Sequence, residues 1–189
     1  MYISKKNKKM DIPTWSLPSG KTCPGSTSFC RKKCYARKTE YIWPCVLPCR
    51  KRNLVASKRE TFEIEMLPLI AKCTKKVPYF RIHESGDFYD QEYLEKWFQI
   101  VRAFPRVRFL AFTKSFHLNF EDKPENLQIV WSIMPDTVCV PRKRNNFPHA
   151  YAGECFYHGR STFECPGHCN ECLFCWYMQA DQSVHFKIH

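Results

Sequence analysis

Residues 79–87 read Tyr-Phe-Arg-Ile-His-Glu-Ser-Gly-Asp, a short strand pattern that runs directly into a polar turn. A helix pattern follows, because Asp90 can cap a segment whose apolar residues recur at helical spacing as far as Pro105. Residues 107–112 and 127–133 give two further strand patterns. Alternating strands and helices joined by short loops predict parallel β/α units with right-handed crossovers.

The flanking segments complete the predicted architecture. Residues 53–75 predict a helix with a bend or break at Pro68, and residues 184–188 predict a short final strand. The chain has 189 residues, fewer than the roughly 250 of a complete eightfold barrel. The sequence therefore predicts an α/β fold, a partial (incomplete) parallel β/α barrel with a C-terminal cysteine-rich metal-binding segment.

Three parts are expected along the chain. Residues 1–12 form a basic flexible arm, residues 13–150 the partial β/α barrel with an N-terminal cysteine loop, and residues 151–189 an iron-sulfur or zinc segment packed on the barrel. With 44% hydrophobic residues the composition is that of a globular protein. No uncharged run approaches the roughly 18 residues of a membrane span, and no signal-type apolar region follows the first residues, so we expect a cytoplasmic protein.

The net charge of +12 is concentrated at one end of the chain. Residues 1–60 hold fifteen Lys and Arg against three acidic residues, whereas residues 61–189 hold fifteen of each sign. Such an uneven field favours a polyanionic partner, and a nucleotide or nucleic acid is the obvious candidate. The alternative is a solvated basic tail with scattered surface lysines, because charge alone specifies no partner.

Twelve cysteines without a secretory signal favour thiolates held for metal over disulfides. The C-terminal group places four of them within eleven residues, as Cys165-x3-Cys169-x2-Cys172-x2-Cys175. A tight single run is typical of iron-sulfur loops, whereas structural zinc takes two well-separated pairs. We expect a 4Fe-4S cluster here, with zinc or unligated thiols as alternatives, and Cys155 or His168 could replace one ligand.

The N-terminal group is looser, with the spacing Cys23-x6-Cys30-x3-Cys34. Three thiolates on a four-iron cluster leave one iron open, and an open coordination position is what chemistry at a metal requires. The alternative is three cysteines packed in a loop or bound to structural zinc. Cys45 and Cys49 follow this group, and either cluster could recruit them.

Polar residues also follow three successive strand patterns. Ser85, Gly86 and Asp87 follow the first, Lys114 follows the second, and Ser132 lies near the end of the third. Ligands of parallel β/α folds bind at the carboxyl ends of the strands, and these groups suit the amino, carboxylate and ribose groups of a nucleoside-bearing cofactor. The alternative is that Ser85 and Asp87 serve only the turn while Lys114 is solvated.

Four segments of the chain resemble the phage gene product 88 family, in the same order. They are Thr22-Cys23-Pro24-Gly25, Cys34-Tyr35-Ala36, Arg81-Ile82-His83-Glu84-Ser85-Gly86-Asp87-Phe88 and Phe112-Thr113-Lys114-Ser115. The match covers roughly residues 15–135.

More distantly, the order of cysteine loop, Ser-Gly-Asp-Phe, Thr-Lys-Ser and Trp-Ser-Ile is similar to radical S-adenosylmethionine enzymes of the spore photoproduct lyase type. This resemblance implies a partial β/α barrel that binds S-adenosylmethionine at the open iron of a 4Fe-4S cluster. It implies that the cluster is bound by Cys23, Cys30 and Cys34. It also implies that the cofactor is contacted by Ser85, Gly86, Asp87, Lys114 and Ser132. The usual spacing in that superfamily is Cys-x3-Cys-x2-Cys, from which this chain departs.

The expected function is thus an iron-sulfur enzyme of radical S-adenosylmethionine type that acts on a nucleotide or nucleic acid and needs an electron donor. Tyr35, His83 and Glu84 lie near the predicted site and are candidates to relay a proton or hydrogen atom. Two alternatives remain open. One is a non-catalytic, metal-stapled nucleic-acid-binding protein of a phage or mobile element, and the other is an electron-transfer partner.

Overall fold

The computed structural model describes residues 1–5, 10–138, 146–153 and 161–187. Its centre is a seven-stranded sheet in which every strand pair is parallel. From one edge to the other, the strands are β1 (Thr14–Trp15), β2 (Tyr79–Ile82), β3 (Arg108–Thr113), β4 (Leu127–Ile133), β5 (His149–Ala152), β7 (Gln182–Phe186) and β6 (Ser161–Glu164). The sheet does not close, because β1 and β6 remain its two outer strands within the described residues.

The predicted parallel α/β architecture is confirmed in this open form. The three strand predictions from the middle of the chain match β2, β3 and β4 to within one residue. The predicted final strand corresponds to β7, which begins and ends two residues earlier. β5 and β6 were not predicted, and the single cysteines Cys139 and Cys155 lie outside the described residues.

Seven helices accompany the sheet in the described part of the chain. They are α1 (Ser28–Lys32), α2 (Tyr35–Ile42), α3 (Val46–Ser57), α4 (Phe62–Thr74), α5 (Gln91–Arg102), α6 (Cys169–Cys172) and α7 (Phe174–Tyr177). Asp90 caps α5 as predicted, since its Oδ1 accepts a hydrogen bond from the backbone N–H of Tyr93 at 2.8 Å. Among these helices, none has the length and apolar character that crossing a bilayer requires.

The single helix predicted over residues 53–75 is wrong, because the chain breaks between α3 and α4 at residues 58–61. Pro68 lies inside α4 and does not end it. Pro68 and Ile64, whose carbonyl loses its usual N–H partner, are both exposed. Water can therefore satisfy that carbonyl, and the proline is tolerated on the outer side of the helix.

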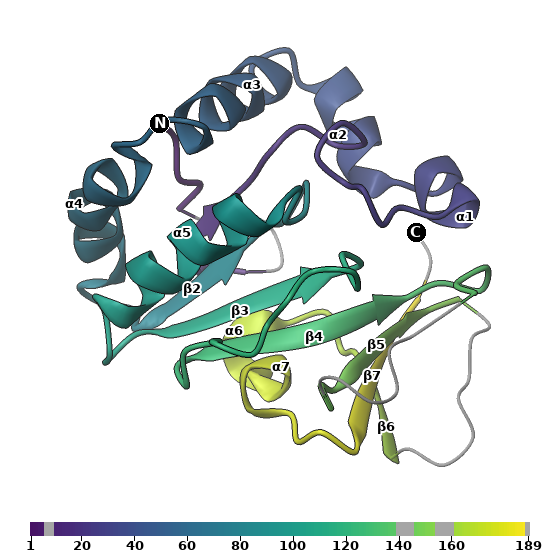
Figure 1. The fold of residues 1–189 in the computed structure, drawn as a ribbon. Coiled ribbons are helices and arrows are strands. Elements are labelled where there is room, and N and C mark those ends of the chain that lie inside the picture. Colours follow the sequence, from purple (N-terminus) through teal and green to yellow (C-terminus); the bar gives the residue numbers. More distant parts are fainter. Residues whose placement is uncertain (6–9, 139–145, 154–160, 188–189) are drawn as a thin grey trace.

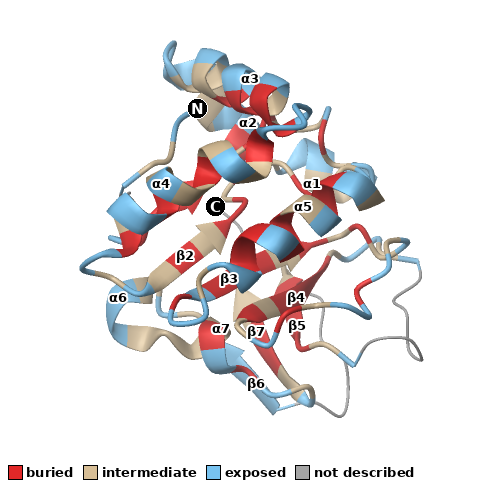
Figure 2. Cartoon of the chain, turned by 60° about the vertical axis from the view of Figure 1, so that its left-hand side comes forward, coloured by how far each residue is buried: buried red, intermediate tan, exposed pale blue. Residues whose placement is uncertain are grey.

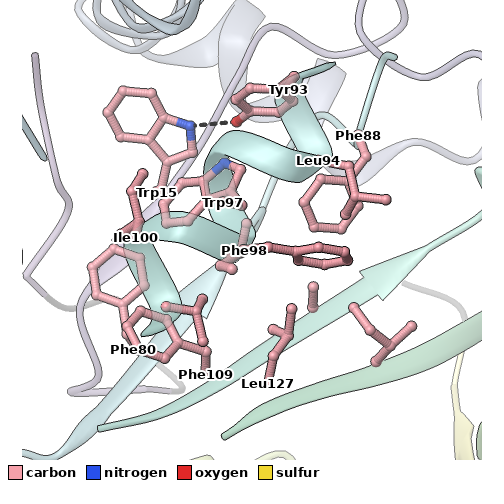
Figure 3. Packing of buried hydrophobic residues seen from close by; sticks show 14 of the residues in the cluster. Trp15, Phe80, Phe88, Tyr93, Leu94, Trp97, Phe98, Ile100, Phe109 and Leu127 are labelled. Carbon is pink, nitrogen blue, oxygen red and sulfur yellow. Dashed lines mark hydrogen bonds between the residues drawn. The ribbon is translucent and has the colours of Figure 1, made fainter. Parts of the chain in front are cut away.

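Figure 1 shows α4 and α5 over one face of the sheet, with α6 and α7 on the other. The first face carries a core of large aromatic side chains in which Phe80 and Phe109 from the strands meet Trp97 of α5 at full burial (Figure 3). Within it, the indole Nε1 of Trp15 donates to the Tyr93 hydroxyl at 2.9 Å, so the polar ends of two core aromatics satisfy one another.

The second face is packed by the C-terminal segment. Leu110 and Val130 point to this side of the sheet, where Trp176 of α7 covers them. Met10 and Ile12 join the same cluster and are each 2% exposed. The last residues of the predicted flexible arm therefore belong to the core of the far face.

Candidate functional site

The carboxyl ends of β2, β3 and β4 meet at one rim of the sheet, where Asp87 organises a buried network. Its Oδ1 accepts hydrogen bonds from the Thr113 hydroxyl at 2.6 Å and the Phe88 N–H at 2.8 Å, and its Oδ2 accepts from the Lys114 N–H at 2.8 Å. Burial raises the pKa of the Asp87 carboxyl, and the hydrogen bonds from Thr113 and Lys114 oppose that rise. Asp87 thus joins the turn after β2 to the loop after β3.

The N-terminal cysteine loop is docked on this rim by close backbone contacts. The Asp87 N–H donates to the carbonyl of Thr22, the residue before Cys23, at 3.0 Å. Gly86 has a φ of +84°, and a Cβ there would lie 2.6 Å from Leu17 Cβ and 2.7 Å from Thr22 Oγ1. The Cβ of any larger residue at position 86 would thus occupy space that the loop fills. Gly86 was predicted to contact a cofactor, and the structure places it against the loop.

A second glycine, Gly25, allows the cysteine loop to approach the segment after β3 closely. A Cβ on Gly25 would lie 1.9 Å from the carbonyl oxygen of Lys114, so the backbone of the loop touches the backbone after β3. Sequence reasoning recorded Gly25 only as part of a family motif. Its role depends on the tertiary contact with Lys114, which no local pattern reveals.

Cys23 is the cysteine closest to this network. Burial raises the pKa of its thiol to about 11. The Asp87 carboxylate also raises this pKa, Cys30 raises it to a smaller extent, and the Lys114 ammonium lowers it. Cys30 lies within α1, and Cys34 directly precedes α2. Within the described residues, no group of three or more His, Cys, Asp or Glu side chains is arranged to hold a metal ion. The described residues thus place the Cys23 thiol within electrostatic reach of Asp87 and do not assemble the predicted trio around an ion.

Beside the cysteine loop lies an open cleft of about 460 Å³. It is lined by three segments, and its lining residues are Gly25, Thr27, Ser28, Arg31, Lys114, Phe116, His117, Asp136, Thr137 and Val138. Lys114 Nζ donates to the Ser132 hydroxyl at 2.9 Å, which joins two predicted cofactor residues from adjacent strand ends. Asp136 Oδ2 accepts from the Phe29 N–H at 2.7 Å, and a hydrogen bond from Thr27 lowers the pKa of the Asp136 carboxyl.

Of the three predicted relay residues, Tyr35 and Glu84 lie at the rim, whereas His83 lies in the core. The Tyr35 hydroxyl donates to the backbone carbonyl of Glu84, so these two meet at the rim. His83 is 3% exposed and has a φ of +65°, and its Nε2 lies 2.9 Å from the Tyr93 hydroxyl. Burial, with a smaller effect of Arg81, lowers the pKa of His83 to about 3. His83 is therefore a neutral core residue, away from the cleft lining.

The C-terminal cysteines form a second site on the far face of the sheet. Cys165 follows β6, Cys169 and Cys172 are the two ends of α6, and Cys175 lies in α7. All four line one cavity of about 40 Å³. Leu173, with a φ of +48°, makes the tight junction between the two short helices. None of the ten described cysteines, these four included, is in a disulfide bond.

Burial is the main influence on the pKa of one of these thiols, that of Cys175. Burial raises the pKa of Cys175 to about 12, and the neighbouring Cys165 and Cys169 add to the rise. Arg81 opposes it and also lines the cavity. The guanidinium of Arg81 lies 5.1 Å from the centre of the Phe112 ring, and its buried Nε has no hydrogen-bond partner among the described residues. Sequence reasoning missed Arg81 as a site residue, although an arginine inside an apolar strand pattern was the available signal.

The described residues thus form an open, parallel α/β protein with a cleft beside the cysteine loop at the sheet rim and a four-cysteine cavity on the far face. Comparison with known proteins places it more closely. A family model described as "Gene product 88" matches residues 2–151, and the chain belongs to this family. The family predicted from the sequence motifs is thereby confirmed.

Two phage proteins are among its relatives. The chain is 32% identical to the Gene 88 protein of Mycobacterium phage D29 over 172 residues, which is 82% of this chain and 71% of that protein. It is 31% identical to the Gene 88 protein of Mycobacterium phage L5, over 82% of this chain and 72% of that protein. No solved structure matches the chain. The comparisons lend no support to the more distant similarity to radical S-adenosylmethionine enzymes.

Proposed function

We propose that the protein is an iron-sulfur enzyme of radical S-adenosylmethionine type that acts on a nucleotide or nucleic acid. The observation that carries the proposal is the position of Cys23. Its thiol interacts with Cys30, Asp87 and Lys114, and the loop from Gly25 to Arg31 that follows it lines a cleft of about 460 Å³. A candidate cluster ligand and a basic ligand-binding cleft therefore share one rim of the sheet.

The strand order supports the same proposal. β1 to β5 follow one another across the sheet in chain order and are all parallel, which is the arrangement of a segment of a β/α barrel. Barrel enzymes bind their ligands at the carboxyl ends of the strands. The Asp87 network and the cleft both lie at these ends. We therefore interpret the open sheet as a partial barrel.

The 4Fe-4S cluster at the rim would be held by the three cysteines of the N-terminal cysteine group, Cys23, Cys30 and Cys34. When bound, a four-iron cluster with one iron free of cysteine supplies an electron to the reductive cleavage of S-adenosylmethionine, and an external donor must replace that electron. The chain's own residues would bind and orient the cofactor. The Lys114 ammonium and the Arg31 guanidinium offer positive charge for a carboxylate or phosphate, and the hydrogen bond from Lys114 to Ser132 fixes the ammonium in the cleft.

Ser85 adds an open hydrogen-bonding position to this rim. Its Oγ is buried and has no hydrogen-bond partner among the described residues, while its backbone carbonyl accepts from the Leu17 N–H at 2.8 Å. A buried hydroxyl without a partner is costly unless a bound group satisfies it. This supports the assignment of Ser85 to ligand binding.

We assign the second cluster to the four cysteines that line the far-face cavity, Cys165, Cys169, Cys172 and Cys175. The support for iron-sulfur over zinc is their spacing, because a tight single run of cysteines is typical of iron-sulfur loops. The positive charge of Arg81 would favour the anionic thiolates that such a cluster requires.

The test uses full-length protein reconstituted anaerobically with iron and sulfide. We expect brown protein that forms 5′-deoxyadenosine from S-adenosylmethionine when dithionite is added. The triple variant Cys23→Ala, Cys30→Ala, Cys34→Ala should lose this product, whereas Cys73→Ala, outside both groups, should retain it. Wild-type protein that contains iron but yields no 5′-deoxyadenosine would contradict the enzymatic proposal.

A second candidate is a non-catalytic, metal-stapled nucleic-acid-binding protein. The observation that favours it is the engagement of Asp87, because three protein donors already occupy its carboxylate. In this case the rim network is purely structural. Colourless protein with stoichiometric zinc and no product from S-adenosylmethionine would support this candidate over the first.

A further inference from the structure

The outer surface of helices α1 to α3 carries exposed charge of one sign. Residues 28–57 contain eight Lys and Arg and a single acidic residue, Glu40. Glu40 is not free to balance them, because it accepts from Arg50 at 2.9 Å and from Ser19, and the Arg50 and Glu40 side chains are only 8% and 9% exposed. The exposed basic residues of this stretch are Arg31, Lys32, Lys33, Arg37, Lys38, Lys51 and Arg52.

Large aromatic side chains stand among these charges. Tyr41 is 92% exposed and Trp43 is 59% exposed, and Tyr41 lies on α2 one turn after Arg37 and Lys38. The buried side of α2 is formed by Ala36 and Glu40 instead. Figure 2 shows exposed residues over much of α1 to α3, in contrast to the mostly buried residues of β3 and β4. These rings therefore do not contribute to the core of the described chain.

We infer that this basic aromatic surface on α1 to α3 binds single-stranded nucleic acid. Cations that follow a backbone, interleaved with exposed rings on which bases stack, are the features by which proteins bind unpaired strands. Tyr41 and Trp43 can stack only on bases that are not already paired, so the surface favours single strands over duplex. The inference rests on the proposed function, of which it names the substrate class.

The surface also leads to the cleft. Arg31 of α1 lines the cleft together with Lys114 and His117, and it begins the row of exposed cations that continues into α2. A strand held along α2 would therefore reach the cleft at its α1 end. This continuity is what a substrate-binding surface requires, because the reacting nucleotide must enter the site while its neighbours remain bound.

The experiment measures fluorescence anisotropy of labelled oligonucleotides with the full-length protein over a range of salt concentrations. Single-stranded DNA and RNA of mixed sequence are compared with the matching duplex. We expect the single strands to bind about tenfold more tightly or better, because stacking on each base is lost in the duplex. Affinity should fall with salt, at a slope of about −0.7 for each phosphate contacted.

Two double variants separate stacking from charge. Tyr41→Ala with Trp43→Ala should weaken single-strand binding by about tenfold or more at each salt concentration, with the salt slope unchanged. Arg37→Gln with Lys38→Gln should reduce the slope by about 1.4, since two phosphate contacts are lost. Lys75→Gln with Lys76→Gln makes the same charge change at exposed positions after α4 and should leave binding as in the wild type.

Three outcomes would overturn the inference. They are duplex binding as tight as single-strand binding, wild-type affinity in the Tyr41 and Trp43 variant, or binding only to vesicles of anionic phospholipid. Circular dichroism of each variant confirms that it is folded. The triple variant of Cys23, Cys30 and Cys34 should still bind the oligonucleotide. Failure of the enzymatic proposal, seen as absence of 5′-deoxyadenosine, is thereby distinguished from failure of this inference, seen as absence of binding.

Discussion

The rim of the sheet and the cavity on its far face both carry cysteines, but they are built in different ways. At the rim, Gly25 lies against the backbone of Lys114 and Gly86 against the side chains of Leu17 and Thr22, and the buried Asp87 ties three segments together. On the far face, two helices of four residues hold three of the four thiols, and beside Gly167 there is open space for a Cβ.

This difference indicates which site depends on a metal for its order. The Asp87 carboxylate at the rim is satisfied by protein hydrogen bonds, so its geometry exists before any ligand binds. On the far face, burial and then the neighbouring Cys165 and Cys169 raise the pKa of the Cys175 thiol to about 12, which opposes its ionisation. A cationic metal centre would remove that penalty, and its binding energy would stabilise the short helices. We therefore expect the two regions to respond differently to mutation.

Substitution of the two glycines should give the largest contrast. Gly25→Ala places a Cβ 1.9 Å from the Lys114 carbonyl oxygen, so backbone must move. We expect this overpacking to lower the free energy of unfolding by about 3 kcal/mol. In Gly167→Ala the new Cβ meets no atom within 4 Å. Only the strain of an alanine at a φ of +82° remains, and it should lower the free energy of unfolding by about 1 kcal/mol. Urea unfolding measures both, and equal losses would contradict the contrast.

The Asp87 network comes next in size. In Asp87→Asn one carboxylate oxygen is replaced by an NH2 group, which donates and cannot accept, so at least one of the three donors to Asp87 faces another donor. The free energy of unfolding should fall by about 2 kcal/mol. Asp122→Asn makes the same change at an exposed position and should stay within about 0.5 kcal/mol of the wild type. A loss no greater than that of the control would show that Asp87 does not organise the rim.

The buried His83 should make the free energy of unfolding depend on pH. In the unfolded chain a histidine takes up a proton near pH 6.5, whereas burial lowers the pKa of native His83 to about 3. The unfolded state therefore binds more protons between these values, and stability falls as the pH falls, by up to about 1.4 kcal/mol per pH unit.

The variant His83→Asn removes the titrating group and tolerates the φ of +65°. The free energy of unfolding, measured by urea between pH 7 and 4, should then fall less steeply than in the wild type. His117→Asn, at an exposed histidine, serves as the control and should keep the wild-type slope. An unchanged slope in His83→Asn would show that His83 is not the group responsible.

Lys114→Met should have the smallest effect on stability. Methionine keeps an unbranched stem but removes the ammonium that donates to Ser132 at 2.9 Å. We expect the free energy of unfolding to change by less than about 1 kcal/mol, while binding of S-adenosylmethionine to reconstituted protein weakens about tenfold. Titration calorimetry measures the binding. Unchanged affinity would remove Lys114 from the ligand site.

The sequence predicted the middle of the sheet because the strand patterns there are apolar and bounded by turns. β4 begins and ends at the predicted residues, and Asp90 caps α5 as expected. β5 and β6 escaped prediction because they are short, and every residue of β6 is exposed. The segment predicted as an N-terminal cysteine loop contains α1, α2 and the start of α3, and α3 accommodates Pro48 within its first turn.

The site was predicted in part for the same reason. Polar residues after successive parallel strands must meet at one edge, and Asp87 and Lys114 do meet there. No local pattern distinguishes a buried histidine from one in a cleft, so His83 was a candidate relay until its packing was known. Gly25 and Arg81 depend on contacts between distant segments, which periodicity and spacing do not encode.

The most direct test of the central claim is iron and acid-labile sulfide analysis of anaerobically reconstituted protein, with each cysteine group removed separately. The wild type should hold about eight iron atoms, corresponding to two four-iron clusters, and each Cys→Ala set should hold about four. Iron content in the variant of Cys23, Cys30 and Cys34 that equals the wild-type value would show that the rim thiols bind no cluster, and would contradict the account.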